Sequence, residues 1–322
     1  MPKLTRRAVV GALAGLAARK ACAEQDWPTR TVTIIHGFAA GGPSDVVARL
    51  VADGLSRALG RSVIVEPRPG ASGTTAAAQI ARATPDGYTL GVIPSGHATA
   101  AAAFAHLPFR PVDDFTFITV CSEYPYLMAT NADSGIKSVA ELINAAKTRP
   151  TPLLYGTPGV GSGPHLAVEL FGLKTKLKFQ HIPFKGSEPA ATELVAGRLD
   201  FMFDPPSSLI SFVLSGKLNP LAVSSAKPYF ALPQTPSIRE TVPDFSVSAW
   251  QGLIAPAGLP DPILRRLNAE TVRILKDPGT RERMHAFGNE PFPTTPDEFR
   301  NHLVNDIALW TDVAEQIHFE KI

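Results

Sequence analysis

Cysteine is nearly absent from this 322-residue sequence, which contains only Cys22 and Cys121. A chain with so few cysteines cannot be a small scaffold held together by disulfides. Charged residues are also scarce, at 19%, whereas hydrophobic residues make up 44%. This balance excludes a disordered chain and leaves ample apolar material for packed cores. The chain is longer than one domain usually is, and its length suits two domains.

A long apolar run that could anchor the chain in a membrane is also missing. The run at 8–18 has eleven residues, about half of what a membrane-spanning helix needs. Basic residues precede it, and the small residues at 21–23 follow it. This pattern is typical of an export signal, so we expect residues 1–23 to be cleaved after Ala23 and the mature protein to be exported. The pair Arg6-Arg7 hints at the twin-arginine route, and the general secretory route stays open.

Basic residues are not in excess once this signal is removed. It carries five Lys or Arg and no acid, which leaves 26 basic against 29 acidic residues and a net charge of −3. Without a basic surplus, binding to a nucleic-acid backbone loses its electrostatic basis, and we exclude that class. Only Cys121 remains, so no intrachain disulfide can form. We expect this cysteine to be a small buried apolar residue in a strand.

Short β-branched runs alternate with helical segments, a pattern typical of parallel sheets covered by helices. A first series has predicted strands at 32–35, 63–65 and 89–93, with helices from about Ser44 to Leu59 and from about Thr74. A second series begins at 126–128 and has predicted helices at 138–147, 164–173, 187–196 and 207–215 and strands at 152–155, 178–182 and 199–203. The sequence therefore predicts an α/β fold with two lobes, each built on a parallel-rich sheet.

The carboxyl-terminal region lacks this alternation. The last convincing strand, at 247–255, is followed by two or three helices. One of them has a capping box at Thr295 and Glu298 and then an apolar stripe formed by Phe299, Leu303, Ile307, Trp310 and Ala314. We expect these helices to pack back on the first domain, so the chain crosses between domains twice, at 122–126 and 243–250, and forms a hinge. The predicted domains are 24–124 with 248–322, and 125–247.

Two glycine-rich loops, at 38–45 and 157–165, each lie between a predicted strand and a helix. Ligands of open parallel sheets bind at the carboxyl ends of the strands, where helix N-termini present unpaired N–H groups that favour anions. One such loop is as often structural as functional, but two at matching positions indicate a shared ligand site. We expect Gly41 and Gly42 to let the backbone approach the ligand, Ser162 to supply a hydroxyl and His165 a titratable cation.

Other polar residues near strand ends have two interpretations each. Asp45 either complements the dipole of the helix it starts or holds a ligand ammonium or a bridging water. Ser95 and His97 follow a predicted strand, and His97, like His165, is either a ligand-side residue or a helix-surface residue. Asp204 ends a predicted strand and either faces the ligand or caps the next helix.

Signatures of an enzyme are poor. Gly161-Ser162-Gly163 lacks the glycine of a nucleophile elbow, because Val160 occupies that position. There is no phosphate-binding Gly-Lys-Ser/Thr loop, and no His/Cys cluster indicates a metal. A hydrolase using Ser162 and His165 is a minor alternative, because the two lie three residues apart on one helical turn and no acid is seen to orient the histidine. We expect no catalysis and no cofactor.

Several short motifs together carry a resemblance to a known family. They are Phe38-x-x-Gly41-Gly42-x-x-Asp45-x-x-x-Arg49, Pro69-Gly70-Ala71-Ser72-Gly73, Asp86-Gly87-Tyr88-Thr89-Leu90, Gly161-Ser162-x-x-His165-Leu166, Phe184-Lys185-Gly186, Leu221-Ala222-Val223, Leu232-Pro233-Gln234-Thr235-Pro236-Ser237 and Trp250-x-Gly252-Leu253-x-Ala255-Pro256. In this order, the motifs make the chain resemble the Bug-type receptors, the solute-binding components of tripartite tricarboxylate transporters. The resemblance covers essentially the whole mature chain.

This resemblance implies a periplasmic, two-lobed, Venus-flytrap protein of the type II-like periplasmic-binding-protein fold. It implies a monomer that captures a small carboxylate between the two glycine loops, partly through ordered water, and a membrane permease or sensor as partner. Carried over by position, Phe38 shelves the ligand, and the two loops hold it through Ala40, Gly41, Gly42 and Ser44 on one side and Gly159, Gly161 and Ser162 on the other. Thr157, the first residue of the second loop, is a further candidate for ligand binding. The identity of the ligand stays open among dicarboxylates, tricarboxylates, acidic amino acids and aromatic acids.

Two positions depart from the family pattern. Gly37 stands where the family usually has proline, and we expect this to loosen the first loop and alter the shape of the pocket. Pro228 stands where the family often has arginine. We expect this second departure to lie on the surface, away from the cleft.

Overall fold

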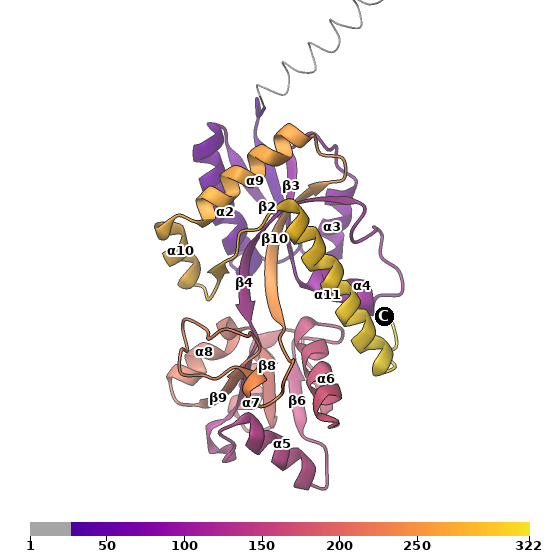
Figure 1. Cartoon of the computed structure of the whole chain (residues 1–322), viewed down its shortest axis with the longest axis vertical. Coiled ribbons are helices and arrows are strands. Elements are labelled where there is room, and N and C mark those ends of the chain that lie inside the picture. Colours follow the sequence, from indigo (N-terminus) through magenta and orange to yellow (C-terminus); the bar gives the residue numbers. More distant parts are fainter. Residues whose placement is uncertain (1–26) are drawn as a thin grey trace, which may run out of the picture.

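The structure is a computed structural model that describes residues 27–322. The predicted export signal at 1–23 lies outside the described residues. The described chain has two parts stacked along its long axis, each built on its own sheet (Figure 1). This arrangement confirms the α/β fold with two sheets. We call the part around the six-stranded sheet lobe 1 and the part around the five-stranded sheet lobe 2.

The sheet of lobe 1 has the order β11-β4-β10-β3-β1-β2. Its parallel half consists of β1 (Val32–His36), β2 (Val63–Pro67) and β3 (Thr89–Pro94). The helices of this half are α2 (Pro43–Leu59), α3 (Thr74–Ala81) and α4 (Gly96–Ala103). Its antiparallel half consists of β4 (Phe115–Pro125), β10 (Ser248–Pro256) and β11 (Glu290–Pro291). In α2, the apolar residues at helical spacing, among them Val47, Val51 and Leu55, are fully buried, which explains why this segment forms a helix on the sheet.

The sheet of lobe 2 has the order β7-β6-β8-β5-β9. Its strands are β5 (Leu127–Asn131), β6 (Leu154–Thr157), β7 (Gln180–Pro183), β8 (Phe201–Asp204) and β9 (Leu218–Val223). Its helices are α5 (Val139–Thr148), α6 (Gly163–Thr175), α7 (Ser187–Val195) and α8 (Pro206–Leu214). β6 runs parallel to β7 and β8, whereas β5 runs antiparallel to β8 and β9, so the sheet is mixed.

Two segments connect the lobes. β4 ends at Pro125 and β5 begins at Leu127, so Tyr126 alone separates the strands of the two sheets. The chain returns after β9 and enters lobe 1 with β10, which pairs with β4 from Ser248 onward. The two connecting strands therefore lie side by side where the lobes meet. The exact domain boundaries stay a prediction.

Three helices close the chain, as the sequence predicts: α9 (Asp261–Leu275), α10 (Pro278–His285) and α11 (Pro296–Gln316). The predicted capping box is present, because Thr295 and Glu298 satisfy each other's backbone N–H groups. α9 packs on α2 and β4, and α11 packs on α4 and β4. α11 also touches α6, so the closing helices contact lobe 2 as well as the lobe on which they were expected to pack.

One apolar cluster runs from lobe 1 into lobe 2 without interruption. It includes Trp250 and Phe299 of lobe 1 and Tyr155 and Phe203 of lobe 2. Two further clusters fill the remaining faces of the sheets, and the buried Cys121 belongs to the one in lobe 1. Within residues 27–322, every helix is too short or too polar to cross a membrane.

Candidate functional site

A groove of about 540 Å³ crosses the boundary between the lobes. Small-molecule pockets typically have volumes of roughly 300–1,000 Å³, so the groove is large enough for a small metabolite. We call it the seam groove. Lobe 1 contributes Gly41, Gly42, Pro43, Val46, His285, Ala286, Phe287 and Gly288, and lobe 2 contributes Ser187, Glu188, Pro205, Ser207, Ser208, Ile210, Tyr229 and Ala231.

Three helices begin at the seam groove, and none of them has a side-chain cap. The N-cap residues of α2, α7 and α8 are Gly42, Gly186 and Pro205, which offer no side-chain acceptor to the first turn. Hydroxyl or carboxylate side chains cap α5, α6, α10 and α11, whereas α3, α4 and α9 also lack a side-chain cap but do not begin at the groove. Uncapped N–H groups at the positive ends of helix dipoles attract anions. The groove therefore suits a negatively charged small molecule.

Asp45 fixes the shape of the first glycine loop. Its Oδ2 accepts hydrogen bonds from the Gly41 N–H at 2.9 Å and from Arg49 Nε at 2.8 Å, and its Oδ1 lies 3.0 Å from His36 Nε2. Burial raises the pKa of this carboxyl, but the hydrogen bonds from Arg49, Gly41 and His36 outweigh burial and lower it to about 2. The carboxylate is thus ionised, and its hydrogen bonds are made to the first glycine loop and to the neighbouring His36 and Arg49. The Gly41 N–H is likewise engaged inside the loop.

The second glycine loop is built in the same way. The Gly161 N–H donates to His165 Nδ1 at 3.1 Å, which repeats the four-residue spacing between Gly41 and Asp45. Ser162 caps α6, because its Oγ accepts from the His165 N–H and donates to the Gly159 carbonyl. Thr157 Oγ1 also donates to that carbonyl and lies 2.6 Å from His181 Nε2. These hydrogen bonds lie within the loop at 157–165 and fix its conformation.

His165 is neutral in this arrangement. Burial lowers its pKa to about 3, with a smaller contribution from His181, on which its ring is stacked at 4.0 Å. An imidazole whose Nδ1 accepts from Gly161 cannot take the proton of Ser162. The Ser162 hydroxyl, for its part, bonds to a carbonyl and a backbone N–H rather than to the ring. This geometry speaks against the hydrolase alternative.

The two glycine loops line different places along the boundary between the lobes. Gly41 and Gly42 line the seam groove, whereas no residue of the loop at 157–165 does. Gly161 instead faces lobe 1 near the end of α4 and the carboxyl terminus. A Cβ built on it would lie 3.0 Å from Ala103 Cβ and 3.4 Å from Ile322 Cδ1. The ring of Phe319 lies 5.9 Å from that of His165. A ligand shared by both loops, as the sequence predicts, stays a prediction.

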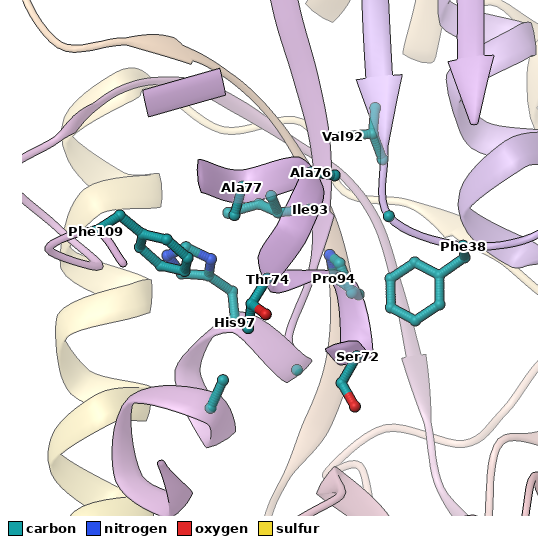
Figure 2. Close-up of a pocket in the computed structure, with 14 residues that line it drawn as sticks. Phe38, Ser72, Thr74, Ala76, Ala77, Val92, Ile93, Pro94, His97 and Phe109 are labelled. Atoms are coloured by element: carbon teal, nitrogen blue, oxygen red, sulfur yellow. The ribbon is translucent and has the colours of Figure 1, made fainter. Parts of the chain in front are cut away.

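Phe38 and His97 line a separate cavity of about 20 Å³ in lobe 1 (Figure 2). A volume of that size holds about one water. Phe38 and Ser72 lie on one side of the cavity, and the His97 ring lies on the other side, stacked on Phe109 at 5.2 Å. His97 Nε2 lies 2.9 Å from the Pro111 carbonyl oxygen, and burial lowers the His97 pKa to about 4. This environment is that of a neutral core histidine.

Of the remaining predicted residues, Ala40 is exposed at the tip of the first loop, whereas Ser44 is buried in the first turn of α2. Ser95 lies where the lobes meet, beside the hydroxyl of Tyr126. Asp204 is fully buried behind the seam groove, where its Oδ2 accepts from Ser208 Oγ at 2.5 Å. It does not cap α8, whose N-cap is Pro205.

Comparison with known proteins gives the family. Residues 47–319 match the family described as tripartite tricarboxylate transporter family receptor. The chain belongs to this receptor family. It is 31% identical to BugT of Bordetella pertussis over 316 residues, which are 96% of each chain.

Solved structures agree with this assignment. An R. palustris protein solved with adipate is 34% identical, has a TM-score of 0.81, and is matched over 92% of the receptor and 100% of its own chain. MatC from Rhodopseudomonas palustris, solved with malate, is also 34% identical, with a TM-score of 0.75 and coverage of 89% and 99%. These similarities confirm the periplasmic-binding-protein fold and place the receptor in a family of solute-binding proteins that are not enzymes.

The unusual Gly37 of the receptor has a structural reason. A Cβ on Gly37 would lie 2.3 Å from the Cα of Gly73, so the two loops touch through their backbones. We expect Gly37→Ala to lower the free energy of unfolding by about 1–2 kcal/mol, because the backbone must shift. Urea unfolding measures this change. Gly42→Ala is the matched control, since its Cβ would meet nothing nearer than 3.5 Å; equal stability of the two variants would contradict the explanation.

Sequence reasoning missed the lobe 2 side of the seam groove. The starts of α7 and α8 contribute Ser187, Pro205 and Ser207. On the lobe 1 side, sequence reasoning also missed Phe287, in the segment after α10. A signal was present, because Phe184-Lys185-Gly186 and Asp204-Pro205-Pro206 both follow strands of the second parallel series. No local pattern shows which of several strand ends face the other lobe.

Proposed function

We propose that this receptor captures a small carboxylate in the seam groove and delivers it to a tripartite tricarboxylate-type transporter in the periplasm. The observation that carries the proposal is the meeting of three uncapped helix N-termini, from both lobes, at one groove of metabolite size. A carboxylate bound there would contact both lobes at once and favour the state in which they touch. The carboxylates bound to the two R. palustris relatives support the ligand class.

A panel of acids tests the ligand class. Adipate, malate, an acidic amino acid and an aromatic acid are titrated into purified receptor by calorimetry, with matched amides as uncharged controls. We expect at least one acid to bind with a dissociation constant near micromolar, about −8 kcal/mol, and the amides to fail. At 100 times that constant the ligand stabilises the protein by about 2.7 kcal/mol, which thermal unfolding detects. Binding of the amides as tightly as the acids would contradict a site selected by charge.

Ser207→Asp tests the place of binding. Ser207 is exposed in the first turn of α8 and lines the groove. An aspartate there complements the helix dipole, so stability should hold or rise slightly. It also places a negative charge beside the bound acid, and we expect affinity to fall about tenfold, or ~1.4 kcal/mol for charges ~6 Å apart at an effective dielectric constant of ~40.

Ser207→Asn is the control for this substitution, because it changes size without charge. Equal affinities of the aspartate and asparagine variants for adipate or malate would place the acid elsewhere on the receptor.

A further inference from the structure

Asp204 is a carboxyl group that the proposed binding site leaves unexplained. It is 0% exposed, and its Oδ1 has no hydrogen-bond partner. Its Oδ2 accepts from Ser208 Oγ at 2.5 Å, and the nearby Ser187 hydroxyl lowers its pKa. Ser187 and Ser208 both line the seam groove. Asp204 is therefore hydrogen-bonded to Ser208, a side chain that lines the groove in which an anion would bind.

No cation compensates this carboxyl among the described residues. The groups that act on it from α7 and α8 are hydroxyls, and the nearest titratable groups on β4 and the adjoining crossing are Tyr124 and Tyr126, which burial keeps neutral. On β5 it pairs with Leu127, which carries no charge. The acidic and imidazole side chains that line the groove are Glu188 on α7 and His285 on α10, and the Nε2 of His285 lies 2.5 Å from an oxygen of Glu290.

An ionised carboxylate in this position carries a large cost. It would be fully buried, with one oxygen unpaired and no positive charge nearby. A protonated carboxyl avoids most of that cost. Burial accordingly raises the pKa of Asp204 to about 6, although the hydroxyls of Ser187 and Ser208 oppose the rise.

We propose that Asp204 takes up a proton when the seam groove captures a carboxylate, so that the receptor binds the anion together with one proton from the solvent. This inference rests on the proposed function. A negative charge at the first turns of α7 and α8 adds to the cost of ionising Asp204, and protonation removes the repulsion. No bond other than the carboxyl O–H forms, and the buffer acid supplies the proton.

The sign of the pH dependence follows from linkage. The complex binds more protons than the free receptor, because the bound anion raises the proton affinity of Asp204 further. Affinity is therefore highest below the pKa of the free receptor, near pH 6, and falls as pH rises above it. We expect the dissociation constant for a fully ionised acid to increase about fivefold between pH 6 and pH 7.5.

Calorimetry in two buffers measures the proton directly. Adipate and malate are titrated at pH 7 in phosphate and in Tris, whose ionisation enthalpies differ, and the difference in binding enthalpy gives the number of protons taken up. We expect the wild type to take up about half a proton, which matches a fivefold change in the dissociation constant over about 1.5 pH units. Asp204→Asn mimics the protonated acid and should take up none, bind more tightly at pH 7.5 and lose the pH dependence. Asp133→Asn, an exposed aspartate of the same lobe, should behave as the wild type.

Ser208→Ala keeps the test open if Asp204→Asn does not fold. It removes a hydroxyl that stabilises the ionised form, so the maximum of proton uptake should move to higher pH. Binding without proton uptake in the wild type, or uptake that persists in Asp204→Asn, overturns this inference and leaves the proposed function intact. Failure of every acid in the panel to bind overturns both.

Discussion

Asp45→Ala is expected to destabilise the receptor by about 3–5 kcal/mol and to abolish ligand binding in the seam groove. The carboxylate is the shared acceptor for Gly41, Arg49 and His36. Its loss leaves the His36 imidazole fully buried with neither nitrogen paired, since Nδ1 already lacks a partner. The Asp45 carboxylate and the His36 ring are buried, whereas Arg49 is half exposed. Removing one member of a buried charged pair typically costs about 3–5 kcal/mol. The first glycine loop, which brings the start of α2 to the groove, then loses its anchor.

The pH dependence of stability tests the same network. The pKa of Asp45 is about 2 in the folded protein, below its ordinary value of 3.8. Its contribution to stability is therefore complete above about pH 5 and is lost as pH falls from about 4 toward 2, with a size of about 2 kcal/mol. Asp45→Asn should lose this part of the acid dependence. Urea unfolding at pH 7, 4 and 3 measures both effects.

Asp53→Asn provides the matched control, because Asp53 is exposed on the same helix. This variant should keep the stability of the wild type at pH 7 and its loss of stability in acid. An Asp45→Ala protein as stable as the Asp53→Asn protein would contradict the anchoring role of Asp45.

Local sequence patterns predicted most of the fold because the signals are local. The spacing of Val47, Val51 and Leu55 marks one buried face, and the capping box at Thr295 marks one helix start; neither depends on distant parts of the chain. β9 was not predicted as a strand, because Leu218–Val223 contains Pro220 and reads as a weak strand signal. This segment forms a strand because it pairs with β5 in the sheet, and its own residues give little indication of that pairing.

The candidate site was harder to predict for a different reason. The same residue types that hold a ligand also hold a loop. Ser162 and His165 have the composition of a ligand cradle, but the structure uses them to cap α6 and to fix Gly161. The uncapped starts of α7 and α8 carry no distinctive side chain at all. Sequence therefore predicts a ligand site at the carboxyl ends of the strands in each lobe, and it could not show which groups at those ends remain free.

Removal of residues 317–322 is the second change with a large expected effect. We call this segment the carboxyl-terminal strap. It turns back at His318, whose φ is 53°, and Ile322 forms two backbone hydrogen bonds with lobe 1, to Ala103 and from Ala105, at 2.8 and 2.9 Å. From there Phe319 and Ile322 reach the second glycine loop of lobe 2, beside His165 and Gly161.

The strap makes two kinds of contact, and each predicts a different effect of its removal. The two backbone hydrogen bonds and the packing of half-buried Ile317 lie within lobe 1, so their loss should lower the free energy of unfolding by about 2–3 kcal/mol. The contacts with His165 and Gly161 exist only while the lobes touch. If ligand capture favours that state, their loss should weaken binding about tenfold, or ~1.4 kcal/mol, through faster dissociation.

Two point variants separate these effects. Phe319→Ala keeps the backbone hydrogen bonds of Ile322 but removes the ring that faces His165 and packs on the apolar cluster, so it should speed ligand dissociation and lower stability less than removal of the whole strap does. Glu320→Ala, which alters an exposed side chain of the same segment, should change neither. Stopped-flow dissociation and urea unfolding give the two quantities. The strap does not line the seam groove, so Phe319→Ala removes no direct contact with the ligand. If this variant slowed ligand association but left the dissociation rate unchanged, the ligand-bound state would not depend on this contact between the lobes.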